Sequence, residues 1–473
     1  MHTVPESSCR FGIARADITP PVGIYHRMWG AARHDKSEGI HRPLLATAMI
    51  FADGGDEETK VLVALDHCVL GENEIAKILQ PAFDSGIVQP EQVTTTCSHT
   101  HAAGLMLLDR AGLPGGEGIE PYLDSVAETV KQIISEAKEN VAPVTMTFTT
   151  GRCDLAAHRD MWDDGTDQWV CGFHPDGPAD DTVVVGRITN EAGKVVAGIV
   201  NYACHPTTLA WDNRQVSPDF PGAMREVVEG VIQAPTVFLQ GASGDLGPVR
   251  GYVGDVEQAD KNGRQLGYAA LSALESLPAP ATEFHYTGPV VSGATIGYWE
   301  DRPCSGERAA QVAAFARAHS DLDLPYRDDN PTPEEVEVRR AELLEQEAAA
   351  TAAGDEQLAG DLRAQVERLT RAQSRFALLP PGSYPYQLSA WRTGDIIWLI
   401  VPGEPYQSLQ VELRERFPQY AIVVITIANH WGPSYLPPQE LYGSGIYQES
   451  IAVLMPGTLE KVIENAAQLI DRL

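Results

Sequence analysis

Strand and helix signals alternate along residues 11–295, and this alternation limits the folds open to the chain. Residues 61–65 and 195–202 are short runs of β-branched and other apolar residues, a composition typical of strands buried within a sheet. Between them, residues 121–140 place apolar side chains on one face of a helix. We therefore predict an α/β fold, in which β-sheets are flanked by layers of helices.

Residues 305–376 have a different character. Ser305 is placed to cap a helix that carries Val312 and Phe315, and Thr332-Pro333-Glu334-Glu335 has the sequence of a capping box with Pro at the first helical position. Apolar residues then recur at helical spacing as far as Phe376. These patterns predict a charged helical hairpin, either solvated or used as an arm through which the chain forms a homo-oligomer.

Strand signals return after this hairpin, at residues 396–401 and 421–427. The simplest arrangement is that these strands complete the domain begun before the hairpin. We therefore predict that residues 1–304 and 377–473 form two parts of one α/β domain, and that residues 305–376 are a helical insertion into it.

The charge of the chain argues against several classes of partner. The sequence has 35 Lys and Arg against 65 Asp and Glu, a formal net charge of -30. An anionic surface of this kind repels nucleic-acid phosphates and acidic lipid head groups, and no apolar run is long enough to span a bilayer. We expect a small-molecule substrate, with neither nucleic-acid binding nor membrane insertion.

The cysteines and the first residues bear on the compartment. The seven cysteines include no Cys-x-x-Cys pair, and the N-terminal residues show neither the basic segment nor the apolar stretch of a signal peptide. This pattern indicates a cytoplasmic protein.

Five apolar strand candidates each end in polar side chains suited to a metal site. The endings are Ser98-His99-Thr100-His101, His205-Pro206, Gln240-Gly241-Ala242-Ser243-Gly244-Asp245, Pro402-Gly403-Glu404, and Asn429-His430-Trp431 with Tyr435 beyond it. In open α/β sheets, ligands bind at the carboxyl ends of the strands. Imidazole and carboxylate ligands suit Zn²⁺ or another divalent transition metal, although either His99 or His101 taken alone is equally consistent with a hydrogen-bonded core histidine.

The order of these motifs resembles the catalytic domain of neutral, non-lysosomal ceramidases. The resemblance is carried by Ala16-Asp17-Ile18-Thr19-Pro20, Gly39-Ile40-His41, Ser98-His99-Thr100-His101, His205, Pro402-Gly403-Glu404, and the tyrosines at 435, 442 and 447. It covers nearly the whole chain except the helices of residues 305–376.

The resemblance implies a zinc site and residues around it. The implied zinc ligands are His99, His205, Glu404 and Tyr435. His101 matches a histidine near the scissile amide, Tyr447 matches a tyrosine that hydrogen-bonds the substrate carbonyl or oxyanion, and Arg159 matches an arginine at the site.

One position departs from the family pattern. Family members carry a serine nucleophile in a Gly-Asn-(Leu/Val)-Ser-Pro segment, whereas this chain has Gly244-Asp245-Leu246-Gly247-Pro248. Gly247 therefore occupies the position of the serine, and we predict a divergent member that lacks the usual nucleophile.

These observations predict a metal-dependent hydrolase, with Zn²⁺ as the expected ion, that cleaves an amide or related carbonyl C–N or C–O bond of a soluble substrate. The nucleophile would be water activated by the metal, with His101 as general base and Tyr447 or Arg159 stabilising the oxyanion. Two alternatives stay open. One is a ceramidase-type lipid amidase in which Ser243 replaces the missing serine, and the other is a non-catalytic metal- or ligand-binding homologue.

Overall fold

Two β-sheets packed face to face form the centre of the molecule. The computed structural model describes residues 3–53 and 59–473. The larger sheet has eight strands in the order β13-β11-β10-β6-β1-β3-β4-β5. Their bounds are β1 (Glu6–Asp17), β3 (Leu45–Ala52), β4 (Thr59–Leu65), β5 (Val93–Cys97), β6 (Ala142–Arg152), β10 (Thr182–Asn190), β11 (Val195–Tyr202) and β13 (Thr236–Gln240). The sheet is mixed, because β4–β5 and β11–β13 are parallel and the other pairs are antiparallel.

The second sheet has four strands in the order β17-β18-β19-β21. They are β17 (Phe315–Pro325), β18 (Ser383–Thr393), β19 (Ile396–Ile400) and β21 (Ala421–Ile425). Large aromatic side chains fill the space between the two sheets, and the ring centroids of Phe51 and Trp398 are 4.8 Å apart. Burial of such side chains is the main stabilisation of a layered fold.

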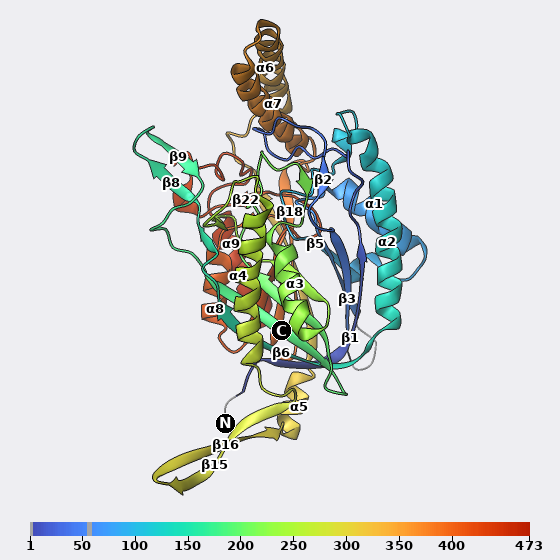
Figure 1. Ribbon diagram of the computed structural model, residues 1–473, viewed down its shortest axis with the longest axis vertical. Helices are drawn as coiled ribbons and strands as arrows, with labels where there is room; N and C mark the ends of the chain where they lie inside the picture. The colour runs from blue at the N-terminus through green and yellow to red at the C-terminus, as the bar shows by residue number, and fades with distance from the viewer. Residues whose placement is uncertain (1–2, 54–58) are drawn as a thin grey trace.

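Helices cover the outer faces of both sheets, as Figure 1 shows. The apolar sides of α1 (Glu72–Asp84) and α2 (Ile119–Glu139) pack on one half of the larger sheet, and α3 (Phe220–Ile232) and α4 (Val256–Glu275) pack on the other half. The helices α8 (Ser408–Arg416) and α9 (Thr458–Asp471) cover the second sheet. The predicted α/β class, with sheets flanked by helices, is confirmed.

A helical hairpin interrupts the second sheet between β17 and β18. It consists of α6 (Pro333–Ala353) and α7 (Glu356–Ala377), and it projects at the top of Figure 1. Thr332 and Glu335 form the capping box that the sequence indicates, and Gly354 ends α6 with a φ of 75°. β17 and β18 pair across the insertion from Phe315↔Thr393 to Pro325↔Ser383.

The helical prediction for residues 305–376 is wrong in its first part. Ser305 does cap α5 (Gly306–Val312), but Phe315 begins strand β17 rather than continuing that helix. The reason lies in an alternation of period two, in which Leu322 and Leu324 are more buried than the acidic residues beside them. The domain boundaries at 304 and 376 stay a prediction.

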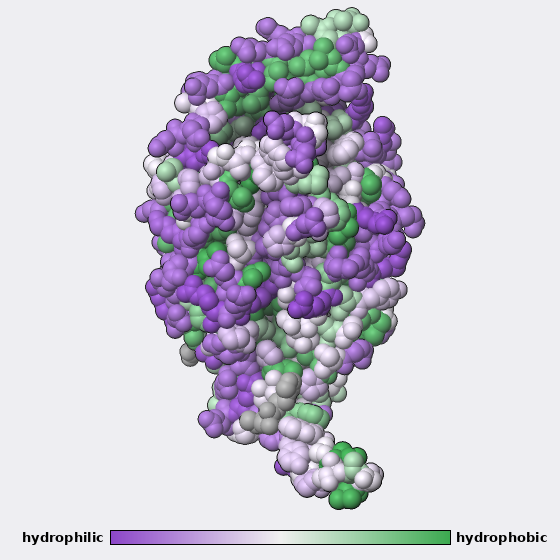
Figure 2. Space-filling view, turned by 90° about the vertical axis from the view of Figure 1, so that its left-hand side faces the viewer, coloured by the Kyte–Doolittle hydropathy of each residue, from purple (hydrophilic) through white to green (hydrophobic). Residues whose placement is uncertain are grey.

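A long β-hairpin projects from the opposite end of the molecule and was not foreseen. It is formed by β15 (Thr282–Ser292) and β16 (Ala294–Pro303), and most of its side chains are exposed. Figure 2 shows apolar side chains at the end of this arm, below a body whose visible face is largely hydrophilic. None of the helices in the described part of the chain has the length and apolar character needed to cross a bilayer.

Short two-stranded pairs complete the fold, and two of them shape the site described below. They are β2 (Gly39–Ile40) with β12 (Gln215–Val216), β7 (Ala156–His158) with β14 (Leu246–Pro248), β8 (Asp160–Asp163) with β9 (Gln168–Cys171), and β20 (Glu404–Pro405) with β22 (Tyr435–Leu436).

Candidate functional site

Chain segments that follow central strands bring the predicted metal ligands together. His99 lies two residues beyond the end of β5, and His205 lies three residues beyond the end of β11. Glu404 and Tyr435 are direct partners in the parallel pair of β20 and β22. His99 has a φ of 67°, and a positive φ costs energy in a residue other than glycine. Strain of this kind is retained at sites where the direction of a side chain matters.

The side chains of these residues meet at one buried point. The Nε2 atoms of His99 and His205 lie 3.2 Å and 3.1 Å from the same oxygen, Oε2 of Glu404. The hydroxyl of Tyr435 lies 3.3 Å from Nε2 of His205. All four residues are buried.

The backbone fixes which nitrogen of each imidazole carries a proton. Nδ1 of His99 lies 2.8 Å from the carbonyl oxygen of Cys68, and Nδ1 of His205 lies 2.7 Å from that of Ser243. A carbonyl oxygen only accepts, so each Nδ1 is the donor and Nε2 of a neutral ring keeps its lone pair. Burial, together with the charge of Arg159, lowers the pKa of His205 to about 3, so this ring is neutral at pH 7.

This donor set fits a divalent cation. The ligand atoms of His99, His205 and Glu404 all lie within 4.8 Å of one another. Burial opposes ionisation of Glu404, but the two imidazoles outweigh it and hold the pKa of its carboxyl well below the usual range. Burial opposes protonation of His99, but the neighbouring Cys68 and Glu404 hold its pKa well above the usual range, so its ring shares a proton with Glu404. A cation bound between the ligands would take the place of that proton.

Cys68, His99 and His101 form a second group with ligand spacing. The second group would need Nδ1 of His99 on the Cys68 side, and that atom already donates to the Cys68 carbonyl. The geometry therefore favours the group containing His205 and Glu404.

Arg159 lies beside the four predicted ligands. It follows strand β7, whose pairing with β14 joins Ala157 to Gly247. Its Nη2 donates to the hydroxyl of Tyr435 at 3.1 Å and to the carbonyl of Gly244 at 2.7 Å. The guanidinium is buried, so it supplies a fixed positive charge next to the convergence point.

His101 and Tyr447 complete the predicted set at the cavity wall. Nε2 of His101 is buried, and it has no hydrogen-bond partner among the described residues. Burial and the neighbouring His99 and His205 hold the pKa of His101 well below its usual range, so the ring is a neutral base at pH 7. The ring of Tyr447 lies 5.8 Å from that of Tyr435 and also faces the cavity.

The structure separates Ser243 from the cavity. Its Oγ lies beside Nδ1 of His205 at 3.3 Å, behind the ring, and accepts a hydrogen bond from Gln240 at 2.6 Å. Ser243 is not among the described residues that line the cavity.

Gly247, by contrast, lies next to three residues that line the cavity. A Cβ placed on Gly247 would meet the hydroxyl of Tyr252 at 3.7 Å, Cδ of Arg159 at 3.8 Å and Oγ1 of Thr207 at 3.9 Å, which are ordinary contact distances. These three residues line the cavity, so a side chain at this position would fit and would face it.

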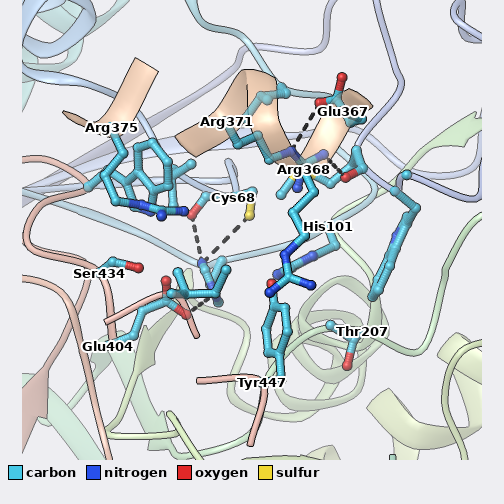
Figure 3. A pocket seen from close by; sticks show the side chains of 18 of the residues that line it. Cys68, His101, Thr207, Glu367, Arg368, Arg371, Arg375, Glu404, Ser434 and Tyr447 are labelled. Atoms are coloured by element: carbon cyan, nitrogen blue, oxygen red, sulfur yellow. Dashed lines mark hydrogen bonds and ion pairs between the residues drawn. The ribbon is translucent and has the colours of Figure 1, made fainter. Parts of the chain in front are cut away.

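The cavity has a volume of about 510 Å³ and contains residues that the sequence motifs did not indicate. These residues are Met28, Trp29, Leu105, Leu107, Trp211 and Tyr252, which line its walls together with Trp431 from a strand-end motif, and α7 covers it on one side. In Figure 3 the side chains of Arg368, Arg371 and Arg375 extend from α7 toward the cavity. Those arginines recur at helical spacing in the sequence, a signal that becomes informative only once the position of α7 is known.

Comparisons with known proteins relate the chain to ceramidases. Residues 10–243 match the family model described as neutral/alkaline non-lysosomal ceramidase, N-terminal. Neutral ceramidase B of Dictyostelium discoideum is 24% identical over 260 residues, which cover 51% of this chain and 36% of that protein. The matched part thus spans about a third of the length of this relative.

Two solved structures share the fold over the whole chain. The crystal structure of neutral ceramidase from Pseudomonas aeruginosa has a TM-score of 0.64 and 15% identity, covering 100% of this chain and 75% of the other. A structure of ceramidase complexed with C2 has a TM-score of 0.63 and 16% identity, covering 100% and 76%. That Gly247 stands in place of the family's serine stays a prediction. Together with the motifs, these comparisons show that residues 10–243 of the chain are similar to the N-terminal part of neutral/alkaline non-lysosomal ceramidases.

Proposed function

We propose that the chain is a ceramidase-like hydrolase that depends on a divalent metal ion, with Zn²⁺ as the ion. It cleaves an amide or a related carbonyl C–N or C–O bond of a soluble substrate, and water is the nucleophile. One observation carries the proposal. Nδ1 of both His99 and His205 is committed to a backbone carbonyl, which leaves the two Nε2 atoms directed at the same oxygen of Glu404.

The residues around this point have the properties that amide hydrolysis needs. A divalent cation held by His99, His205, Glu404 and Tyr435 would lower the pKa of water and polarise a carbonyl. Nε2 of His101, neutral and unpartnered, accepts a proton from the attacking water. The same nitrogen then returns the proton to the leaving amine as the C–N bond breaks.

Charge that develops on the carbonyl oxygen also has partners. Arg159 is buried, and Tyr447 faces the same cavity. A fixed donor of this kind contributes roughly 3 kcal/mol to stabilising an oxyanion.

The position of Ser243 supports water rather than serine as the nucleophile. The Ser243 hydroxyl lies behind His205 and is hydrogen-bonded to Gln240, so it does not face the cavity. Ceramide remains the first lipid substrate to assay, because the relatives bear the name ceramidase.

Metal analysis of the purified protein, combined with amide hydrolysis, tests the proposal. We expect about one equivalent of metal per chain, lost together with activity in His99→Ala. The matched control is His319→Ala, a change of an exposed histidine on β17, which should keep both. Absence of a stoichiometric ion, or full metal content and activity in His99→Ala, would contradict the proposal.

A further inference from the structure

The roof of the cavity is one face of helix α7. The residues that this helix contributes are Ala364, Glu367, Arg368, Arg371, Ser374 and Arg375, which recur at intervals of three and four. Contacts with the body hold the helix in place. Arg371 donates to the backbone carbonyl of Met28, and Ser374 donates to the carboxylate of Asp109.

The charge of the cavity is opposite to that of the chain. Among the described residues, five arginines and two glutamates line it, which gives the lining a charge of +3 before any metal is counted. The five arginines are Arg110, Arg159, Arg368, Arg371 and Arg375, and the two glutamates are Glu367 and Glu404. The whole chain carries -30. A positive pocket within an anionic surface selects for negative ligands.

The arginines have too few carboxylate partners inside the protein. Glu367 accepts from both Arg371, at 3.0 Å, and Arg110, at 3.4 Å, so one carboxylate serves two guanidinium groups. Arg110 is only 1% exposed and also pairs with Asp109 at 3.3 Å, but its Nη2 has no hydrogen-bond partner among the described residues. A buried N–H donor without an acceptor costs free energy, and an oxygen of a bound ligand would supply the acceptor.

Arg375, which lies nearer the predicted metal site, also has a side-chain nitrogen without a hydrogen-bond partner. Its buried Nε has no hydrogen-bond partner among the described residues, and its guanidinium lies over the ring of Trp431 at 5.4 Å. Burial lowers the pKa of Arg375 to about 10, with the charge of Glu404 acting in the opposite direction. The guanidinium is therefore charged at pH 7 and close enough to Glu404 to feel its charge.

We propose that α7 makes the site selective for an amide that also carries an anionic oxygen group, a carboxylate or a phosphate, bound by the arginines of this helix. From residue 368 to residue 375 the helix rises about 10 Å, so the anion can bind along the roof while the amide lies at the predicted metal ligands. The apolar walls formed by Trp29, Trp211 and Trp431 accept a hydrocarbon part of the substrate. This inference rests on the proposed function for its substrate, but its anion site can be tested separately.

Binding of octanoate, octyl phosphate and octanol tests the anion site without any hydrolysis. These probes share one chain and differ in the head group, and the tryptophans of the cavity report binding by fluorescence. We expect the protein to bind at least one of the two anions about tenfold or more tightly than octanol. The anion that binds more tightly shows whether the site prefers a carboxylate or a phosphate. Equal affinity for octanol and both anions would overturn the proposal.

Variants of α7 locate the effect on the helix. Arg375→Gln should weaken binding of the preferred anion about tenfold, and Arg375→Lys should restore part of it. The matched control is Arg363→Gln on the same helix, because Arg363 faces Glu347 at 3.6 Å and Asp35 at 4.0 Å instead of the cavity. Equal anion affinity in Arg375→Gln and Arg363→Gln would overturn the proposal. The proposal would also be overturned if removal of the metal by a chelator abolished the preference for anions over octanol. The anion would then be bound by the metal ion and not by the arginines.

Hydrolysis of a matched pair of amides completes the test. N-octanoylglycine carries a carboxylate, whereas N-octanoylglycinamide is neutral, and N-octanoylethanolamine phosphate gives the phosphate counterpart. We expect kcat/KM to favour an anionic amide about tenfold or more, and this ratio to fall in Arg375→Gln but not in Arg363→Gln. Turnover without an anion preference overturns the inference alone. Anion binding without turnover of any of the three amides contradicts the proposed function and leaves the anion site supported.

Discussion

At the scale of single residues, the site depends on backbone groups as much as on its motifs. That His99, His205, Glu404 and Tyr435 lie close together could be predicted from short motifs, because each motif follows a strand that is easy to recognise. Their role as metal ligands stays a prediction. Trp29 and Tyr252 could not be predicted, since each reaches the cavity from a loop without a motif. The carbonyls of Cys68 and Ser243 that orient the two imidazoles leave no trace in the sequence, because any residue supplies a carbonyl.

A substitution of His101 distinguishes a role of this residue in proton transfer from a role as a metal ligand. We expect His101→Gln to lower kcat about 100-fold or more, in line with loss of a general base, while the metal content stays at the wild-type level. Steady-state kinetics and metal analysis of the same preparation check this. Loss of the metal together with activity would indicate instead that the ion is held by the group containing Cys68 and His101.

Gly247 gives a second test at this scale. Because a Cβ fits there at ordinary contact distances, we expect Gly247→Ser to fold with a free energy of unfolding within about 0.5 kcal/mol of the wild type. The new hydroxyl faces the cavity, so a serine-reactive phosphonate should label the variant and leave the wild type unlabelled. Labelling of the wild type that Ser243→Ala abolishes would instead support the serine mechanism.

At the scale of secondary-structure elements, local signals predicted the helices better than the strands. The capping box at Thr332 and the apolar periodicity before Phe376 reflect contacts within a few residues, and α6 and α7 form as expected. Strand β17 depends on pairing with β18, from Pro325↔Ser383 to Phe315↔Thr393, across the inserted hairpin. The alternation within residues 315–325 is a local signal of a strand, but the sequence does not show which strand it pairs with across the hairpin. Nothing local shows that α7 covers a cavity.

The capping box offers a way to loosen the hairpin without touching the cavity. Thr332→Ala removes the side chain that accepts from the backbone N–H of Glu335, at a cost of about 1 kcal/mol. We expect faster hydrogen exchange in residues 333–353 and, because α6 supports α7, weaker anion binding. Ser305→Ala, which removes the same kind of cap from α5, is the control and should leave exchange in α6 unchanged. Unchanged exchange in α6 of Thr332→Ala would contradict this view of the hairpin.

At the scale of the whole molecule, buried neutral histidines tie stability to pH. Burial lowers the pKa of both His26 and His67 to about 4, whereas unfolded histidine titrates near 6.5. Between these values the unfolded chain binds more protons, so stability is complete above about pH 6.5 and falls as the pH approaches 4. Each of these histidines accounts for a loss of about 2 kcal/mol at pH 5.

Thermal unfolding at several pH values measures this effect. We expect the unfolding temperature to fall between pH 7 and pH 5, and to fall less in His67→Gln than in the wild type. The exposed His319→Ala variant should follow the wild type. An unfolding temperature independent of pH over this range would contradict the assignment of neutral buried imidazoles.

The central claim is that one metal ion is held between His99, His205 and Glu404. Crystals of the purified protein, measured at the zinc absorption edge, test it most directly by the position of anomalous density. We expect one strong peak in contact with Nε2 of His99, Nε2 of His205 and the carboxylate of Glu404. A site without anomalous density, or a peak held by Cys68 and His101 instead, would contradict the claim.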